Sequence, residues 1–227
     1  MKIVRFSQKG LVGCWRFDEE TGSTAKDSSP YGNHGTIYGA TRVRGIIGKA
    51  LSFDGVDDYV DCGNKPIYNF TEFSVAIWIN GKILPSDLGH SLSFIGRGYD
   101  SSNYEGWDLN WWTNDYIYFT VGNGSTFQEP RFLFQKTNEW HHIVGTYDGT
   151  TIKLFLDGEF KDSKTLTGFK NKDASLFVGR SYRTYYFNGL IDEVRIYNRA
   201  LSPGEIKIIY AFTKYIKPHP IIMRRKL

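Results

Sequence analysis

The stretch GLIDEVRIYNRALSPGEI, residues 189–206, decides how this chain folds and where its chemistry lies. Apolar and polar residues alternate in its first half, which is typical of a strand whose successive side chains point to opposite faces. The alternation assigns one face to Leu190, Asp192, Val194 and Ile196, so a carboxylate is expected among apolar side chains. Because an ionised carboxylate is costly to bury alone, we expect Asp192 to be bound by a cation, a basic side chain or several backbone N–H groups. The stretch therefore predicts a buried strand with a site at Asp192.

Short apolar runs recur along the chain and are separated by clusters of Gly, Asp, Asn and Ser. The predicted strands are 12–17, 50–53, 59–62, 73–79, 92–95, 107–111, 116–121, 141–147, 151–156, 175–178 and 191–197. Asp148-Gly149 and Asp157-Gly158 have the composition of hairpin tips. Ser202-Pro203-x-Glu205 predicts a helix start, and we expect this helix to reach Thr213. The pattern indicates an all-β sandwich with one short helix near the end.

Five further segments occur with residues 189–206 in a specific order and spacing. They are GLVGCWRFDEETG at 10–22, Asp27 followed by SSPYGNHGTI at 28–37, ALSFDGVDDYVDCG at 50–63, FSVAIWI at 73–79 and EWHHIVGTYDGTTIKLFLDGE at 139–159. Together they resemble laminin-G-like, concanavalin-A-like jelly-roll domains. The resemblance implies a two-sheet antiparallel jelly-roll β-sandwich, often with a bound calcium ion, in proteins that bind glycans or other surfaces. It does not fix the ligand, because this architecture serves lectins, adhesion modules and some glycosidases.

Composition is consistent with one domain. The chain has 227 residues, of which 41% are hydrophobic and 16% aromatic, enough for one core. We expect the domain to occupy residues 1–212 and a tail to occupy 213–227. The net charge of +4 is scattered, so no basic face for nucleic acid is predicted. No segment is apolar enough for a signal peptide or a membrane span, whereas the resemblance implies a place outside the cell, on a cell surface or on a virion.

The two cysteines, Cys14 and Cys62, fall in predicted early strands. One disulfide between them is conceivable, and two buried free thiols are the alternative.

A calcium site is the first candidate for chemistry, because the first and last strands of a jelly roll commonly lie side by side. Asp18, Asp27 and Asn33 are the oxygen-bearing residues nearest in that arrangement to Asp192. Calcium takes six to eight oxygen ligands, and a loop rich in Gly, Asn and Asp suits it. The alternative is that Asp27 and Asn33 stabilise turns while Asp192 accepts backbone hydrogen bonds.

A second group of carboxylates competes with this site. Asp54, Asp57, Asp58 and Asp61 lie within eight residues of one another. Such a group either holds a cation or is solvated on a turn, and the solvated turn is the more frequent case.

An aromatic surface is the second candidate. Alternation separates Trp107, Leu109 and Trp111, expected in the core, from Asp108, Asn110 and Trp112. In the next strand it separates Ile117, Phe119 and Val121 from Tyr116 and Tyr118. Aromatic faces bury the C–H face of a sugar ring, while Asn and Asp bind its hydroxyl groups. Loops 97–104 and 180–186 supply a rim of Tyr99, Tyr104, Tyr182, Tyr185 and Tyr186; the alternative is that these loops cover the sheet and the rings are ordinary packing.

Signatures of catalysis are lacking. No E-x-D-x-E triplet occurs, and no serine-hydrolase, zinc-protease or phosphate-loop motif is present. His141 and His142 are neighbours that point to opposite faces of a strand, so we interpret them as structural. The leading hypothesis is a non-catalytic lectin-like module that binds carbohydrate or a glycosylated surface, with one structural Ca²⁺ and several copies in an assembly. A protein-binding structural or adhesion module without a sugar site is the alternative, and a glycoside hydrolase with carboxylates from separate strands is the third hypothesis.

Overall fold

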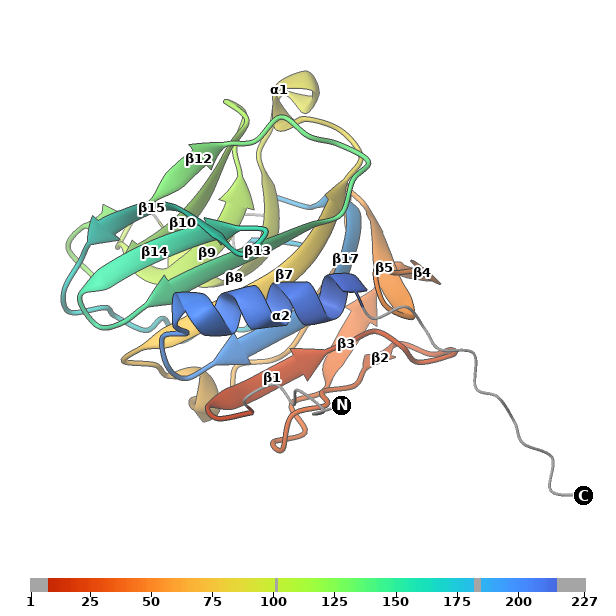
Figure 1. Cartoon of the computed structure of the whole chain (residues 1–227), viewed down its shortest axis with the longest axis horizontal. Coiled ribbons are helices and arrows are strands. Elements are labelled where there is room, and N and C mark those ends of the chain that lie inside the picture. The colour runs from red at the N-terminus through yellow and green to blue at the C-terminus, as the bar shows by residue number, and fades with distance from the viewer. Residues whose placement is uncertain (1–7, 101, 182–184, 216–227) are drawn as a thin grey trace, which may run out of the picture.

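The fold is built from two antiparallel sheets that face each other, as the computed structural model shows for residues 8–100, 102–181 and 185–215 (Figure 1). Sheet A has the order β15 (Glu159–Thr165), β14 (Thr151–Leu156), β13 (His141–Tyr147), β7 (Phe73–Gly81), β17 (Asn188–Tyr197), β5 (Lys49–Asp54) and β4 (Thr41–Arg44), and β1 (Leu11–Trp15) pairs with β17. Sheet B has the order β11 (Phe127–Gln128), β10 (Tyr116–Gly122), β9 (Glu105–Trp111), β8 (Leu92–Asp100), β16 (Leu176–Val178), β6 (Tyr59–Asp61), β3 (Gly35–Tyr38) and β2 (Thr24–Ala25), and β12 (Arg131–Leu133) pairs with β10. The predicted all-β jelly-roll sandwich is confirmed.

The core lies between the two sheets. It contains Trp107, Leu109 and Trp111 from β9 and Ile117, Phe119 and Val121 from β10, as the alternation predicted. The expected hairpins are present, because β13 pairs with β14 and β14 with β15. At the second hairpin tip Asp157 and Gly158 both have positive φ values, 53° and 81°, as a type I′ hairpin turn requires.

Both cysteines are buried free thiols. Cys62 packs in the core between the sheets, whereas Cys14 packs in the second apolar cluster on the outer side of sheet A. The two side chains therefore belong to different layers, and the disulfide alternative is not realised.

Three helices are described: the 3-10 helix η1 (Pro66–Tyr68), the short α1 (Pro85–Leu88) and α2 (Pro203–Tyr215). Ser202 and Glu205 cap the start of α2 reciprocally, as their spacing predicted. No helix of the described residues is long and apolar enough to cross a membrane.

Helix α2 covers the outer face of sheet A (Figure 1). Trp78 of β7 stacks on Tyr210 with ring centroids 5.6 Å apart, and its Nε1 donates to Thr213 Oγ1 at 2.8 Å. Thr213 is therefore a packed part of the fold, and the domain boundary expected after residue 212 falls inside the helix. Helix α2 covers part of the outer face of sheet A, whereas the aromatic side chains predicted to bind a ligand lie on the outer face of sheet B.

Candidate functional site

The outer face of sheet B brings together the side chains that alternation had placed there. Across β10, β9 and β8, Tyr118 is opposite Asn110 and Asn110 is opposite Ser93. One row further, Asp108 is opposite Gly96. Because Ser93 and Gly96 of β8 are small residues, the middle of this face is recessed. Asp108 and Asn110 of β9 form the floor of the recess.

A slot opens over this floor. It has a volume of about 20 Å³, room for one water-sized group, and is lined by Tyr99, Asp108, Asn110, Trp112, Ser181 and Tyr185. Tyr99 and Trp112 come from opposite ends of the β8–β9 pair, because Asp100 pairs with Glu105 and Leu92 with Trp111. Five of these six residues were predicted from the sequence as ligand-binding residues, and Ser181 was not.

Hydrogen bonds fix the floor of the slot. Asp108 Oδ1 accepts from Ser93 Oγ at 2.7 Å, and Asp108 Oδ2 accepts from Asn110 Nδ2 at 3.0 Å. The other amide atom, Asn110 Oδ1, is buried and has no hydrogen-bond partner among the described residues. A buried acceptor without a donor is costly. Because Asn110 lines the slot, a donor group that enters the slot would remove this cost.

Trp112 is the exposed ring of the slot, with 36% of its surface accessible. Its ring packs edge-on against Tyr118 at 5.9 Å, and Arg131 lies 5.6 Å from the ring centroids of both Tyr116 and Tyr118. Tyr118 is thereby buried, and its hydroxyl accepts a hydrogen bond from Asn114 Nδ2 at 2.8 Å. Tyr118 therefore packs against Trp112, Tyr116 packs against Tyr118, and neither tyrosine lines the slot.

The predicted rim is divided by the structure. Tyr99 and Tyr185 line the slot, whereas Tyr104 stacks on Phe127 with ring centroids 5.5 Å apart. Tyr182 lies outside the described residues. The described part of the loop lies beside the slot, because Ser181 N donates to Tyr185 O at 3.2 Å and both side chains line it.

The strand around Asp192 contains a β-bulge that the alternation did not predict. Asp192 pairs with Trp78 and Arg195 with Ala76, so Glu193 and Val194 together oppose one residue of β7. Glu193 adopts the left-handed conformation, with φ of 53°. The expectation that Asp192 shares a face with Val194 and Ile196 is therefore wrong, since those two lie in the core between the sheets and the bulge turns Asp192 to the other side.

Asp192 and Asp18 converge on the turn formed by residues 45–49. Asp192 Oδ2 accepts from Ile47 N at 3.2 Å, and Asp18 Oδ1 accepts from Lys49 N at 3.0 Å. A Cβ atom at Gly45 would collide with the carboxylate of Asp192, and one at Gly48 with that of Asp18. The two glycines therefore allow both carboxylates to approach the turn closely. Gly45 and Gly48, three residues apart, are the feature of the sequence that could have indicated this turn, because the alternation within strands does not include them.

The charge around Asp192 is unbalanced. Its side chain is fully buried and accepts one further hydrogen bond, from Glu193 N at 2.6 Å. Arg16 pairs with Asp18 at 3.0 Å and with Glu193 at 3.4 Å, but no basic side chain of the described residues pairs with Asp192. Burial, assisted by the nearby carboxylates of Glu193 and Asp18, raises the pKa of Asp192 to about 8. A cation at this position would relieve both the burial and the repulsion.

Asp27 and Asn33 do not join this group. The carboxylate of Asp27 accepts four hydrogen bonds, from Cys14 N, Ser29 N, Ser29 Oγ and Asn33 N, at 2.6–2.8 Å. Asn33 Nδ2 donates to Val12 O at 2.8 Å. Asp27 also forms an isolated β-bridge with Trp15 of β1, and β1 pairs with β17 along its other edge. The two residues fasten the loop to β1, which is the turn-stabilising alternative.

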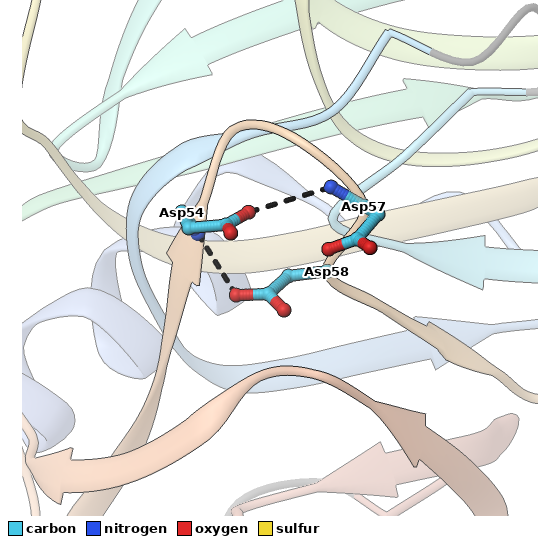
Figure 2. A group of neighbouring side chains, drawn as sticks. All are labelled: Asp54, Asp57 and Asp58. Atoms are coloured by element: carbon cyan, nitrogen blue, oxygen red, sulfur yellow. Dashed lines mark hydrogen bonds between the residues drawn. The ribbon is translucent and has the colours of Figure 1, made fainter.

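The acidic cluster forms a turn between β5 and β6 (Figure 2). Asp54, Asp57 and Asp58 place carboxylate oxygens within 4.8 Å of one another, but Asp54 and Asp57 are exposed. Asp54 Oδ1 accepts from Val56 N at 2.8 Å, and Asp58 Oδ2 accepts from Asp54 N at 2.9 Å. Asp61 points to Gly63 N instead, at 2.7 Å. These contacts stabilise the turn, in which Asp54 and Asp57 are exposed and Asp58 is buried.

The histidines have structural positions. His141 Nδ1 lies 2.8 Å from Asp157 Oδ2, whereas His142 is buried beside Trp78 with ring centroids 5.2 Å apart.

Comparison with known protein families identifies the class of protein. A family model described as the concanavalin A-like lectin/glucanases superfamily matches residues 54–207, more than half of the chain. The chain therefore belongs to this superfamily, as the resemblance indicated. No curated protein sequence is significantly similar to it.

Solved structures share the fold. Domain 4 of AbnA, a GH43 extracellular arabinanase from Geobacillus stearothermophilus, in complex with arabinotriose, superposes with a TM-score of 0.71 at 26% identity, over 88% of this chain and 98% of that domain. The binding domain of Paraclostridial Mosquitocidal Protein 1 gives 0.74 at 16% identity, over 89% of this chain and 52% of that one. The binding domain of botulinum neurotoxin DC in complex with SialylT gives 0.69 at 14% identity, over 92% and 52%. Because the two toxin binding domains are only 16% and 14% identical to this chain, they support the fold alone. This chain spans about half the length of each.

Proposed function

We propose that this protein is a non-catalytic, lectin-like module that binds carbohydrate in the slot on the outer face of sheet B. The observation that carries the proposal is the buried, unpartnered Asn110 Oδ1 at the floor of a slot bordered by aromatic rings, within the described part of the chain. A sugar hydroxyl would supply the missing donor. The similarity to an arabinanase domain in complex with arabinotriose supports this class of ligand.

Binding would divide between a ring and a hydroxyl group. The exposed Trp112 would bury the C–H face of one sugar ring, and the small slot would admit one of its hydroxyl groups to Asn110. Asp108 holds the Asn110 amide in place through its hydrogen bond to Nδ2. Each contact is weak, so several copies on a surface or a larger assembly, outside the cell, would provide avidity.

The absence of catalysis is part of the proposal. A glycosidase requires two carboxyl groups on either side of the scissile bond, roughly 5 Å apart when configuration is retained. Asp108 is the one carboxylate among the described residues that line the slot, and Ser93 and Asn110 already hydrogen bond to it. A hydrolase would be revealed by turnover of an oligosaccharide panel.

A structural Ca²⁺ completes the proposed function. Asp192 and Asp18 are the carboxylates that would hold it, with Asp27 and Asn33 reassigned to the loop that they fasten. Two observations support this assignment: both residues offer carboxylate oxygens to the same turn, and Asp192 has no basic partner among the described residues. The ion would join β17 to the turn at 45–49.

Replacement of Trp112 tests the sugar site. Trp112→Ala should weaken binding of an arabino-oligosaccharide about tenfold, because one stacked ring contributes roughly 1.4 kcal/mol. Isothermal titration calorimetry measures the loss, and unchanged thermal unfolding shows that the variant is folded. Tyr31→Ala is the matched control, since Tyr31 is exposed in the loop before β3 and does not line the slot. Equal binding by Trp112→Ala and Tyr31→Ala would refute the assigned site and favour a protein-binding module.

A further inference from the structure

A second aromatic cluster lies on the same face of sheet B, across the 180–186 loop from the slot. Tyr38 of β3 stacks on Tyr59 of β6, with ring centroids 4.6 Å apart and planes inclined by 14°. The ring of Phe177 of β16 packs edge-on against Tyr59, with centroids 5.8 Å apart, and the ring centroid of Tyr186 lies 6.4 Å from that of Tyr59. Tyr38 is 45% exposed, so the cluster reaches the surface. Except for Tyr186, none of these rings was predicted to bind a ligand.

The cluster carries a cation. The guanidinium carbon of Arg180 lies 4.3 Å from the ring centroid of Phe177, 4.6 Å from that of Tyr59 and 5.8 Å from that of Tyr186. Its Nε donates to Ser181 O at 3.3 Å, and no carboxylate of the described residues forms an ion pair with it. Asp61, which is opposite Phe177 in the sheet, accepts a hydrogen bond from Gly63 N. Arg180 therefore has a fixed orientation and N–H groups without a partner among the described residues.

This combination has a defined chemical preference. A guanidinium group stacked on aromatic rings keeps its edge available, and that edge matches the two oxygens of a carboxylate. The neighbouring exposed ring of Tyr38 offers a face for the C–H groups of a sugar. A sugar unit with a carboxylate satisfies both.

The cluster and the slot are parts of one surface. Arg180 and Tyr186 form a β-bridge, and the next pair along, Ser181 and Tyr185, lines the slot. Strands β9 and β6 are three positions apart in sheet B, which corresponds to about 14 Å at about 4.8 Å per strand. One oligosaccharide can thus contact both.

We infer that the Tyr38, Tyr59, Phe177 and Arg180 cluster is a second subsite that binds a carboxylate-bearing sugar unit of an oligosaccharide held in the slot. This inference rests on the proposed function of the slot. It assigns the ligand class as acidic oligosaccharides.

Matched pairs of glycans test the inference on the whole chain. The probes are an oligogalacturonide and its methyl ester, sialyllactose and lactose, and arabinotriose as a neutral reference, each titrated calorimetrically at two salt concentrations. The acidic member of at least one pair should bind about tenfold more tightly than its neutral counterpart, with a difference that shrinks at high salt. This comparison needs no variant.

Variants locate the preference. Arg180→Gln should abolish the difference within the pair, and Arg180→Lys should reduce it because the fork is lost while the charge stays. Arg44→Gln is the matched control, since Arg44 is an exposed arginine of β4 in sheet A and its replacement removes the same net charge. A preference that Arg180→Gln leaves intact, or that Arg44→Gln abolishes equally, would overturn the inference.

The outcomes separate this inference from the proposed function. If neutral glycans bind and the acidic members bind no better, the second subsite is refuted while the slot stands. If no probe binds, both are refuted.

Discussion

Asp192 is the residue whose charge we expect to control the stability of the fold. Its pKa is raised from 3.8 to about 8, mainly by burial. In chelator, the folded state therefore binds a proton more tightly than the unfolded chain, and the free energy of unfolding contributed by this group falls as the pH rises from about 4 to about 8. At about 1.4 kcal/mol per pKa unit, the full difference corresponds to about 6 kcal/mol.

Calcium should reverse this loss. An ion that binds the folded state alone adds about 2.7 kcal/mol at one hundred times its Kd, which is a rise of roughly 5–10 °C in Tm for a chain of this size. Because protons compete with the ion for Asp192, the difference in Tm between calcium and chelator should be larger at pH 8 than at pH 6. Thermal unfolding followed by circular dichroism measures it.

Asp192→Asn identifies the residue responsible. The amide can accept only one of the two hydrogen bonds from Ile47 N and Glu193 N, so the variant is less stable overall and its response to calcium is the relevant measurement. We expect the Tm of the variant to be the same in calcium and in chelator. We also expect its free energy of unfolding to lack the decrease between pH 6 and pH 8 that the wild type shows in chelator. Asp57→Asn, in the acidic turn, should behave as wild type. A wild-type protein indifferent to calcium, or an Asp192→Asn variant that still responds, would refute the reasoning.

Two further predictions concern a buried ring and the floor of the slot. His142 is buried against Trp78 and Tyr210, and burial lowers its pKa to about 3, so stability should fall as the pH drops below about 6.5. In urea unfolding, wild type should lose about 3 kcal/mol more than His142→Phe between pH 6.5 and 4, and parallel pH profiles would contradict this. A Cβ atom at Gly96 would lie 2.5 Å from Asp108 Oδ1, so Gly96→Ala should displace the floor and weaken glycan binding about tenfold in calorimetry. Unchanged affinity in a folded Gly96→Ala variant would show that the floor takes no part.

The alternation of apolar and polar residues correctly assigned side chains to the core or the outer face where the strands are regular. In β9 it separated Trp111 from Asn110 and Trp112, and the structure places these on the core and outer sides as expected. It failed in β17, because the bulge is formed by Glu193 rather than by a glycine and nothing in the sequence marks it. One extra residue reverses every later side chain.

The sites were predicted only where local sequence was enough. A loop rich in Asp, Asn and Gly suits a calcium ion and a hydrogen-bonded turn equally well, and the four hydrogen bonds accepted by Asp27 distinguish them after folding. The rings of Tyr38, Tyr59 and Phe177 come from three strands whose adjacency depends on long-range pairing. Single-strand patterns carry no information about such pairing.

Mapping a bound glycan onto the protein tests the central claim most directly. Arabino-oligosaccharide titrated into isotopically labelled protein and followed by NMR should produce the largest shifts at the Trp112 indole N–H and the Asn110 side-chain amide. Tyr99 and Tyr185 should follow, because they line the same slot. Shifts confined to the turn at 45–49 or to the α2 side of sheet A would contradict the assignment of the outer face of sheet B as the glycan surface.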